Sequence, residues 1–207
     1  MSFVKASSSF TRFRIIDDIS QELWEAIPEK LHQFSFTDID NTAEERSFGW
    51  TNFDDMLDTS WQISPPEKAD YLAFSLRLDT RRIPPAVMRK HVQLAIREEQ
   101  KRIAEQGKKF IARERKKELA EQVKLRLMGK FLPIPAEFQI VWNTTTGRVY
   151  LASTQQKIIE LFLDLFTRSF NIRLEQLQPY NLALSLLGND VSEKLDALEG
   201  TQFLLRG

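Results

Sequence analysis

Hydrophobic and polar residues alternate in several short stretches, which predict β-strands. The clearest is 71–79 (YLAFSLRLD), where large apolar side chains at every second position share one face. Weaker alternation at 138–142 and 149–151, on either side of a turn with Asn and Gly, predicts a β-hairpin. Two further strands are expected, at 10–16 and 174–177.

Apolar residues spaced three and four apart predict helices in much of the remaining chain. In order, the expected helices are one that follows a Ser20 cap, then 85–106, 113–128, 154–169 and 179–187. Pro28 is expected to kink or restart the first helix. Ser153 lies three residues before Gln156, which is the spacing of a capping box. The helix that follows is apolar on most sides, so we expect it at the centre of the fold.

Residues 35–66 show neither period clearly, and we expect mostly loop with a short piece of helix or strand. This segment contains Trp50 and Trp61. For both tryptophans we favour a role as core anchors over base stacking, because nothing nearby is strongly basic.

The order of these elements favours an α+β fold with an antiparallel or mixed sheet and packed helices. Strands come in local pairs instead of alternating evenly with helices. Two regions stand out within this arrangement. Residues 84–130 form a projecting helical hairpin with thin apolar stripes, and residues 136–187 form the β-hairpin and the central helix.

Composition narrows the class of protein. The chain is 42% hydrophobic and 28% charged, which is typical of a globular protein. It has no cysteine, which excludes disulfides, thiolate zinc sites and cysteine catalysis. The first ten residues lack the apolar segment of a signal peptide, and the longest apolar run, 158–166, is too short for a membrane span. We therefore expect a cytoplasmic protein without membrane contact.

Charge is distributed unevenly along the chain. The 29 Lys+Arg and 29 Asp+Glu give a formal net charge of zero. Residues 86–130 alone hold fourteen Lys/Arg and six Glu, a local charge of +8 that the rest of the chain offsets. A basic helical segment on a neutral protein favours a polyanionic partner, although a solvated charged face is the simpler alternative.

The candidate DNA-binding residues all lie in or just before this segment. They are Arg81, Arg82, Arg89, Lys90, Arg97, Lys101, Lys108, Lys109, Phe110, Arg113, Lys116 and Lys117. Each cation that neutralises a phosphate releases a counterion, which makes binding favourable and dependent on salt. Helix periodicity spreads these cations over more than one face. Phe110, at the expected tip, either inserts between bases or stabilises the turn, and the sequence leaves both roles open.

Two other functions remain as alternatives. A metal-dependent nuclease would need clustered carboxylates, for which Asp54, Asp55 and Asp58 are candidates together with the E-x-K triplets that begin at Glu99 and Glu114. A protein-interaction module would pair an apolar stripe of the hairpin (Met88, Val92 and Ile96) with another helix. There is no Gly-rich phosphate loop, no GxSxG motif and only two histidines, so we expect no nucleotide hydrolysis and no Ser/His/Asp triad. We expect no cofactor and no bound metal.

Several ordered blocks of sequence resemble one known family. They are Ile83-Pro84-Pro85 before a long helix, Glu98-Glu99-Gln100 or Glu105-Gln106-Gly107-Lys108-Lys109, the run 113–119 (RERKKEL), Leu132-Pro133, Val141-Trp142, 147–151 (GRVYL) followed by Ala152-Ser153, and Phe48-Gly49-Trp50. Together they are similar to the recombination-associated RdgC family over about residues 8–187. The whole chain, 1–207, is accordingly expected to be an RdgC-like region. Family members are usually longer, so we expect a C-terminal part to be absent or replaced.

The resemblance implies a function without catalysis. RdgC proteins form ring-shaped homodimers that bind double-stranded DNA with little sequence preference and restrain strand exchange by RecA. A nucleoid-associated cytoplasmic protein that modulates recombination or replication is therefore expected. Some family members are labelled exonucleases, but no motif in this sequence supports that label.

Overall fold

The computed structural model describes residues 3, 9–62, 64–107 and 110–199. Its body is an antiparallel sheet with the strand order β2-β4-β5-β6-β1-β7, and β3 pairs with β4 outside this path. The strands are β1 (Thr11–Ile15), β2 (Arg46–Asn52), β3 (Glu67–Lys68), β4 (Tyr71–Thr80), β5 (Ile134–Asn143), β6 (Arg148–Leu151) and β7 (Leu174–Gln176). The predicted α+β class is confirmed, and every strand pair in the described residues is antiparallel.

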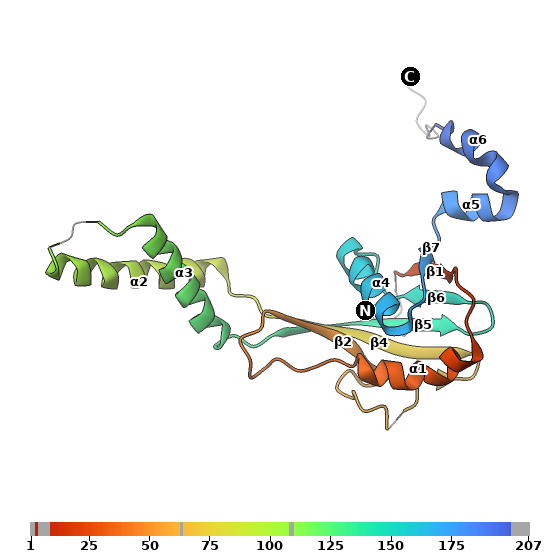
Figure 1. Ribbon diagram of the computed structural model, residues 1–207, viewed down its shortest axis with the longest axis horizontal. Coiled ribbons are helices and arrows are strands. Elements are labelled where there is room, and N and C mark those ends of the chain that lie inside the picture. Colours follow the sequence, from red (N-terminus) through yellow and green to blue (C-terminus); the bar gives the residue numbers. More distant parts are fainter. Residues whose placement is uncertain (1–2, 4–8, 63, 108–109, 200–207) are drawn as a thin grey trace, which may run out of the picture.

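Two helices cover one face of this sheet: α1 (Gln21–Gln33) and α4 (Gln156–Phe170) (Figure 1). Trp142 of β5 contacts both, with ring centroids 5.1 Å from Trp24 of α1 and 5.4 Å from Phe166 of α4. As predicted, α4 is central, and its inward side chains include Phe162, which is fully buried. Burial of such large aromatic side chains supplies most of the hydrophobic stabilisation of the body.

As predicted, the described part of 35–66 is mostly loop with one strand, β2, at 46–52. Its Trp50 is completely buried, as expected of a core anchor, and donates through Nε1 to Oγ of Ser169 at 2.8 Å. Two other expectations were wrong. Pro28 does not restart the first helix, because α1 runs continuously through it. Ser153 is not the cap of α4. The helix begins at Gln156, and the Ser153 hydroxyl accepts instead from the backbone N–H of Gln155.

The predicted helical hairpin consists of α2 (Pro85–Glu105) and α3 (Arg113–Met128). It projects from one end of the sheet, where β4 leads into α2 and α3 leads back into β5 (Figure 1). The proline at the first position of α2 suits a helix start, since that position needs no N–H donor. The hairpin is therefore joined to the body through two adjacent strands.

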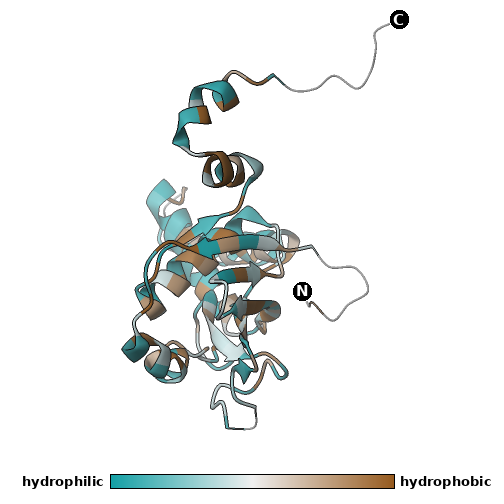
Figure 2. Ribbon diagram, turned by 90° about the vertical axis from the view of Figure 1, so that its right-hand side faces the viewer, coloured by the Kyte–Doolittle hydropathy of each residue, from teal (hydrophilic) through white to brown (hydrophobic). Residues whose placement is uncertain are grey.

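The chain leaves the sheet at the opposite end through α5 (Pro179–Leu187), a 3₁₀ turn (Asn189–Val191) and α6 (Ser192–Asp196). The short helix α6 was not predicted. Figure 2 shows α5 as a largely hydrophobic helix that stands off the sheet body, and none of its residues is fully buried. Within the described residues, no helix combines the length and the apolar character needed to cross a membrane.

Candidate nucleic-acid interface

One face of α2 carries a row of exposed cations. Lys90, Arg97 and Lys101 are separated by seven and four residues, which places them on the same side of a helix. We call these three residues the outer row of α2. All three are exposed, and within the described part of the chain no ion pair involves them. Glu98 and Glu105 lie on the flank of this row, close enough in sequence to reduce its charge without cancelling it.

The opposite side of α2 packs on α3, and a buried carboxylate lies at the centre of that contact. Glu99 is only 8% exposed and accepts from Arg102 at 2.7 Å and from Arg115 of α3 at 2.9 Å. The hydrogen bond from Arg115, followed by that from Arg102, lowers the pKa of Glu99, so the carboxylate stays ionised. Leu119 and Val123 supply the apolar part of the contact. These ion pairs fix which side of α2 faces outward.

α3 carries a row of exposed carboxylates in addition to its cations. Glu114, Glu118 and Glu121 recur at spacings of four and three, so they share one face, and all three are exposed. We call them the acidic row of α3. Sequence reasoning missed it because the charges of the whole hairpin were summed, although the spacing is visible in the sequence. α3 therefore presents this acidic row beside its own exposed cations, whereas the outer row of α2 contains cations only.

The structure separates the other candidate residues. Arg81 is 4% exposed, and its guanidinium donates to the backbone carbonyls of Ile39, Asp40, Thr42 and Glu44. It holds the loop before β2 in place and is not available at the surface.

Most of the remaining candidates are exposed: Arg82, Arg89, Phe110, Arg113, Lys116 and Lys117. Phe110 is 89% exposed. Arg89 immediately precedes Lys90, so it lies about 100° around α2 from the outer row. Arg113 and Lys117 are four residues apart and share one side of α3. Lys108 and Lys109 fall outside the described residues.

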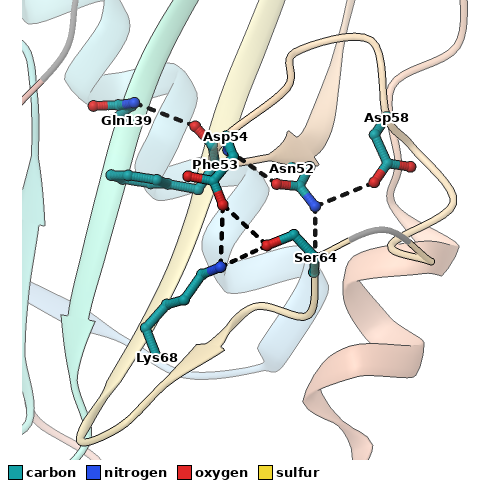
Figure 3. A network of polar contacts seen from close by, with 7 residues as sticks. All are labelled: Asn52, Phe53, Asp54, Asp58, Ser64, Lys68 and Gln139. Atoms are coloured by element: carbon teal, nitrogen blue, oxygen red, sulfur yellow. Dashed lines mark hydrogen bonds and ion pairs between the residues drawn. The ribbon is translucent and has the colours of Figure 1, made fainter.

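The acidic loop that suggested a nuclease uses its carboxylates locally (Figure 3). Oδ2 of Asp54 accepts from Nζ of Lys68 at 3.1 Å and from Oγ of Ser64, and the bond from Lys68 is the main cause of a lowered pKa for Asp54. Asp58 is buried and accepts from Asn52. Among the described residues, no three His, Cys, Asp or Glu side chains are grouped so that they could hold a metal ion.

The side chains of the E-x-K triplet that begins at Glu99 also do not face one another. Glu99 points into the contact with α3, whereas Lys101 belongs to the outer row of α2. These two side chains therefore do not face a common site. Asp54, Asp58 and Glu99 are thus engaged by neighbouring side chains within the fold.

Comparison with known proteins identifies the family of this chain. A family model described as "RdgC: Putative exonuclease, RdgC" matches residues 8–189 of the 207-residue chain. The chain belongs to the RdgC family. This match confirms the family resemblance found in the sequence blocks. At the level of the family, RdgC proteins are recombination-related and DNA-binding. A search of curated proteins finds no match to this chain.

Proposed function

We propose that this RdgC-family protein binds double-stranded DNA through the outer row of α2, without reading base sequence. The supporting observation is that Lys90, Arg97 and Lys101 form one exposed row with no ion pair among the described residues. Eleven residues of helix span about 17 Å, a length that covers about five phosphates of one DNA strand. Lysine and arginine contacts to phosphate position a protein on DNA but carry no sequence information.

A salt titration of DNA affinity tests this proposal. The Lys90→Glu/Arg97→Glu/Lys101→Glu variant should lose most of its affinity for a labelled duplex in fluorescence anisotropy. The slope of log affinity against log salt should fall in magnitude by about three, one for each lost phosphate contact. The control variant Lys30→Glu/Lys157→Glu/Lys194→Glu has the same change in net charge away from the hairpin. Equal losses in the two variants would show that total charge matters and not the outer row.

We propose further that binding is not coupled to cleavage. The support is that Asp54 and Asp58 are engaged by neighbouring side chains, as Figure 3 shows. Incubation of a linear duplex with the protein and Mg²⁺ or Mn²⁺ should leave the DNA intact. Metal-dependent degradation that disappears in Asp54→Ala or Asp55→Ala would establish the nuclease alternative instead.

The unit that acts on DNA is proposed to be a homodimer at the nucleoid. Exposed apolar side chains at the ends of the hairpin support this, namely Phe110 at 89% and Leu132 at 73%. The mass in solution, measured by light scattering, should be twice that of the 24.2 kDa chain. A protein that occupies duplex DNA should also slow strand exchange by RecA, and the outer-row variant should slow it less.

A further inference from the structure

The face of the sheet opposite α1 and α4 carries a second group of arginines, at the end away from the hairpin and beside α5. Arg12 and Arg14 flank Phe13, which is fully buried against Phe162 of α4 at 5.4 Å between ring centroids. Because side chains alternate along a strand, Arg12 and Arg14 point to the other face. On β6, Arg148 lies directly opposite Arg14 in the register. Cations from two neighbouring strands are thus brought together.

The charges in this group are only partly balanced by the chain itself. Like charges directly opposite each other destabilise a sheet unless a counter-charge is present. Arg14 has one, because it forms an ion pair with Glu175 of β7. Arg12 is exposed and has no ion pair in the described residues. Nη1 of Arg148 is closed off from solvent and finds no hydrogen-bond acceptor there. A buried donor without a protein acceptor is satisfied in folded proteins by an ordered water or a bound ion, so an anion in this position would complete its hydrogen bonding.

A cavity lies beside these arginines. Its volume is about 180 Å³, and its lining residues are Arg12, Arg148, Tyr150, Leu177 and Leu182. Tyr150 stands opposite Arg12 in the register and packs edge-on against Phe10, with ring centroids 6.0 Å apart. Phe10 is itself 44% exposed. The site therefore combines guanidinium donors with an accessible aromatic side chain.

We propose that this cavity binds a phosphate group of a nucleic-acid strand that lies on the face of the sheet opposite α1 and α4, beside α5. Guanidinium groups present forked donors that match the oxygens of a phosphate. Phe10 next to the arginines offers a surface on which a base can stack. This inference rests on the proposed DNA-binding function, and it adds a contact that is separate from the outer row of α2.

The two contacts are far enough apart to be tested with duplexes of different length. The 21 residues of α2 span about 32 Å, and the ten residues of β4 span about 33 Å. In Figure 1 the hairpin and the strands follow one another along the long axis of the molecule. A duplex of about 12 base pairs, roughly 41 Å long, is too short to bridge both ends, whereas one of about 36 base pairs is long enough.

The test compares Arg12→Ala and Arg12→Ala/Arg148→Ala with the wild type. The double variant should bind the long duplex about tenfold more weakly, with a smaller salt slope, and the single variant about threefold more weakly. Arg12 is exposed, so its single variant should fold normally even if the double variant is less stable. Arg173→Ala is the matched control, an exposed arginine at the same end that is paired with Asp17. It should stay within twofold of the wild type.

The short duplex and small anions separate this site from the hairpin. Loss of affinity by the double variant should be larger for the long duplex than for the short one. Unchanged affinity of both arginine variants for the long duplex would overturn the proposal. If the wild type binds no DNA, the proposed function fails by itself. Calorimetry with inorganic phosphate then tests the cavity by itself. Phosphate binding that needs Arg12 and Arg148 supports a site for free phosphate. Tighter binding of an acidic peptide overturns the assignment of the cavity to phosphate.

Discussion

The sheet body and the helical hairpin are stabilised in different ways. In the body, large aromatic side chains pack between the sheet and its two helices, as with Trp50 on Phe74 at 5.2 Å between ring centroids. In the hairpin, the contact between α2 and α3 consists of a few apolar side chains around the buried carboxylate of Glu99. The body depends on nonpolar burial, whereas the hairpin depends in part on ion pairs.

This difference bears on function. The outer row of α2 takes no part in either kind of contact, so its charges can change without loss of the fold. The arginines on the face of the sheet opposite α1 and α4 are closer to the stabilising contacts, since Arg14 is paired and Arg148 is partly buried. Substitutions in the outer row of α2 should therefore change binding with less effect on stability than substitutions of these arginines.

Trp50→Ala should produce the largest loss of stability. It removes a fully buried indole from the body and the hydrogen bond to Ser169. Large-to-small changes of this kind cost about 3–5 kcal/mol of unfolding free energy. Urea denaturation followed by circular dichroism measures it. Leu57→Ala, at a side chain 68% exposed, is the control and should change stability by about 0.5 kcal/mol or less. A similar small loss for both would mean that the aromatic core is not what holds the body together.

Arg81→Met should destabilise the junction between body and hairpin by about 2–3 kcal/mol, because it leaves buried carbonyls of residues 39–44 without donors. Arg82→Met changes the neighbouring, exposed arginine and should have almost no effect on stability. Denaturant unfolding compares the two variants directly. If Arg82→Met were the more destabilising, the structural assignment of these two residues would be reversed.

These two arginines also show where sequence reasoning ends. Periodicity was enough to predict β4, α4 and both hairpin helices, because each carries its own apolar pattern in adjacent residues. The same local pattern says nothing about Arg81 and Arg82, which are identical in type. Arg81 is buried because the 39–44 loop folds around it, and that contact joins residues about forty positions apart. No local signal contains it.

The candidate site divides in the same way. The outer row of α2 follows from spacing alone, but which side of α2 faces outward depends on Arg115 of α3, which pairs with Glu99 on the opposite side. The bounds of β2 were not predicted, because its flanks are polar and Gly49 is a poor strand residue. Pairing with β4 over its whole length makes it a strand. Long-range pairing therefore decided what local preference could not.

Gly49→Ala tests whether the close approach of Phe36 to β2 contributes to stability. A Cβ at this position would lie 2.5 Å from the backbone N and Cα of Phe36, which runs alongside β2. Backbone has to move to relieve this overlap, so we expect a loss of about 1–3 kcal/mol in denaturant unfolding. Gly129→Ala is the control, because a Cβ there would meet no atom within 4 Å. Equal stability of the two variants would show that the close approach of Phe36 is not required.

Glu99→Gln should have the smallest effect, and one that depends on pH. Hydrogen bonds from Arg115 and Arg102 lower the pKa of Glu99 in the folded hairpin. A lowered folded pKa stabilises the fold above the ordinary glutamate pKa of about 4.3, and this contribution is lost as the pH falls through the folded value. The wild type should therefore have the higher Tm at pH 7, and the difference from Glu99→Gln should shrink below about pH 4.

Glu114→Gln, in the acidic row of α3, has no such ion pair in the described residues and should show little difference at either pH. A difference between wild type and Glu99→Gln that stays constant with pH would mean that the ion pairs do not hold the two helices together, and apolar packing at Leu119 and Val123 would then be sufficient.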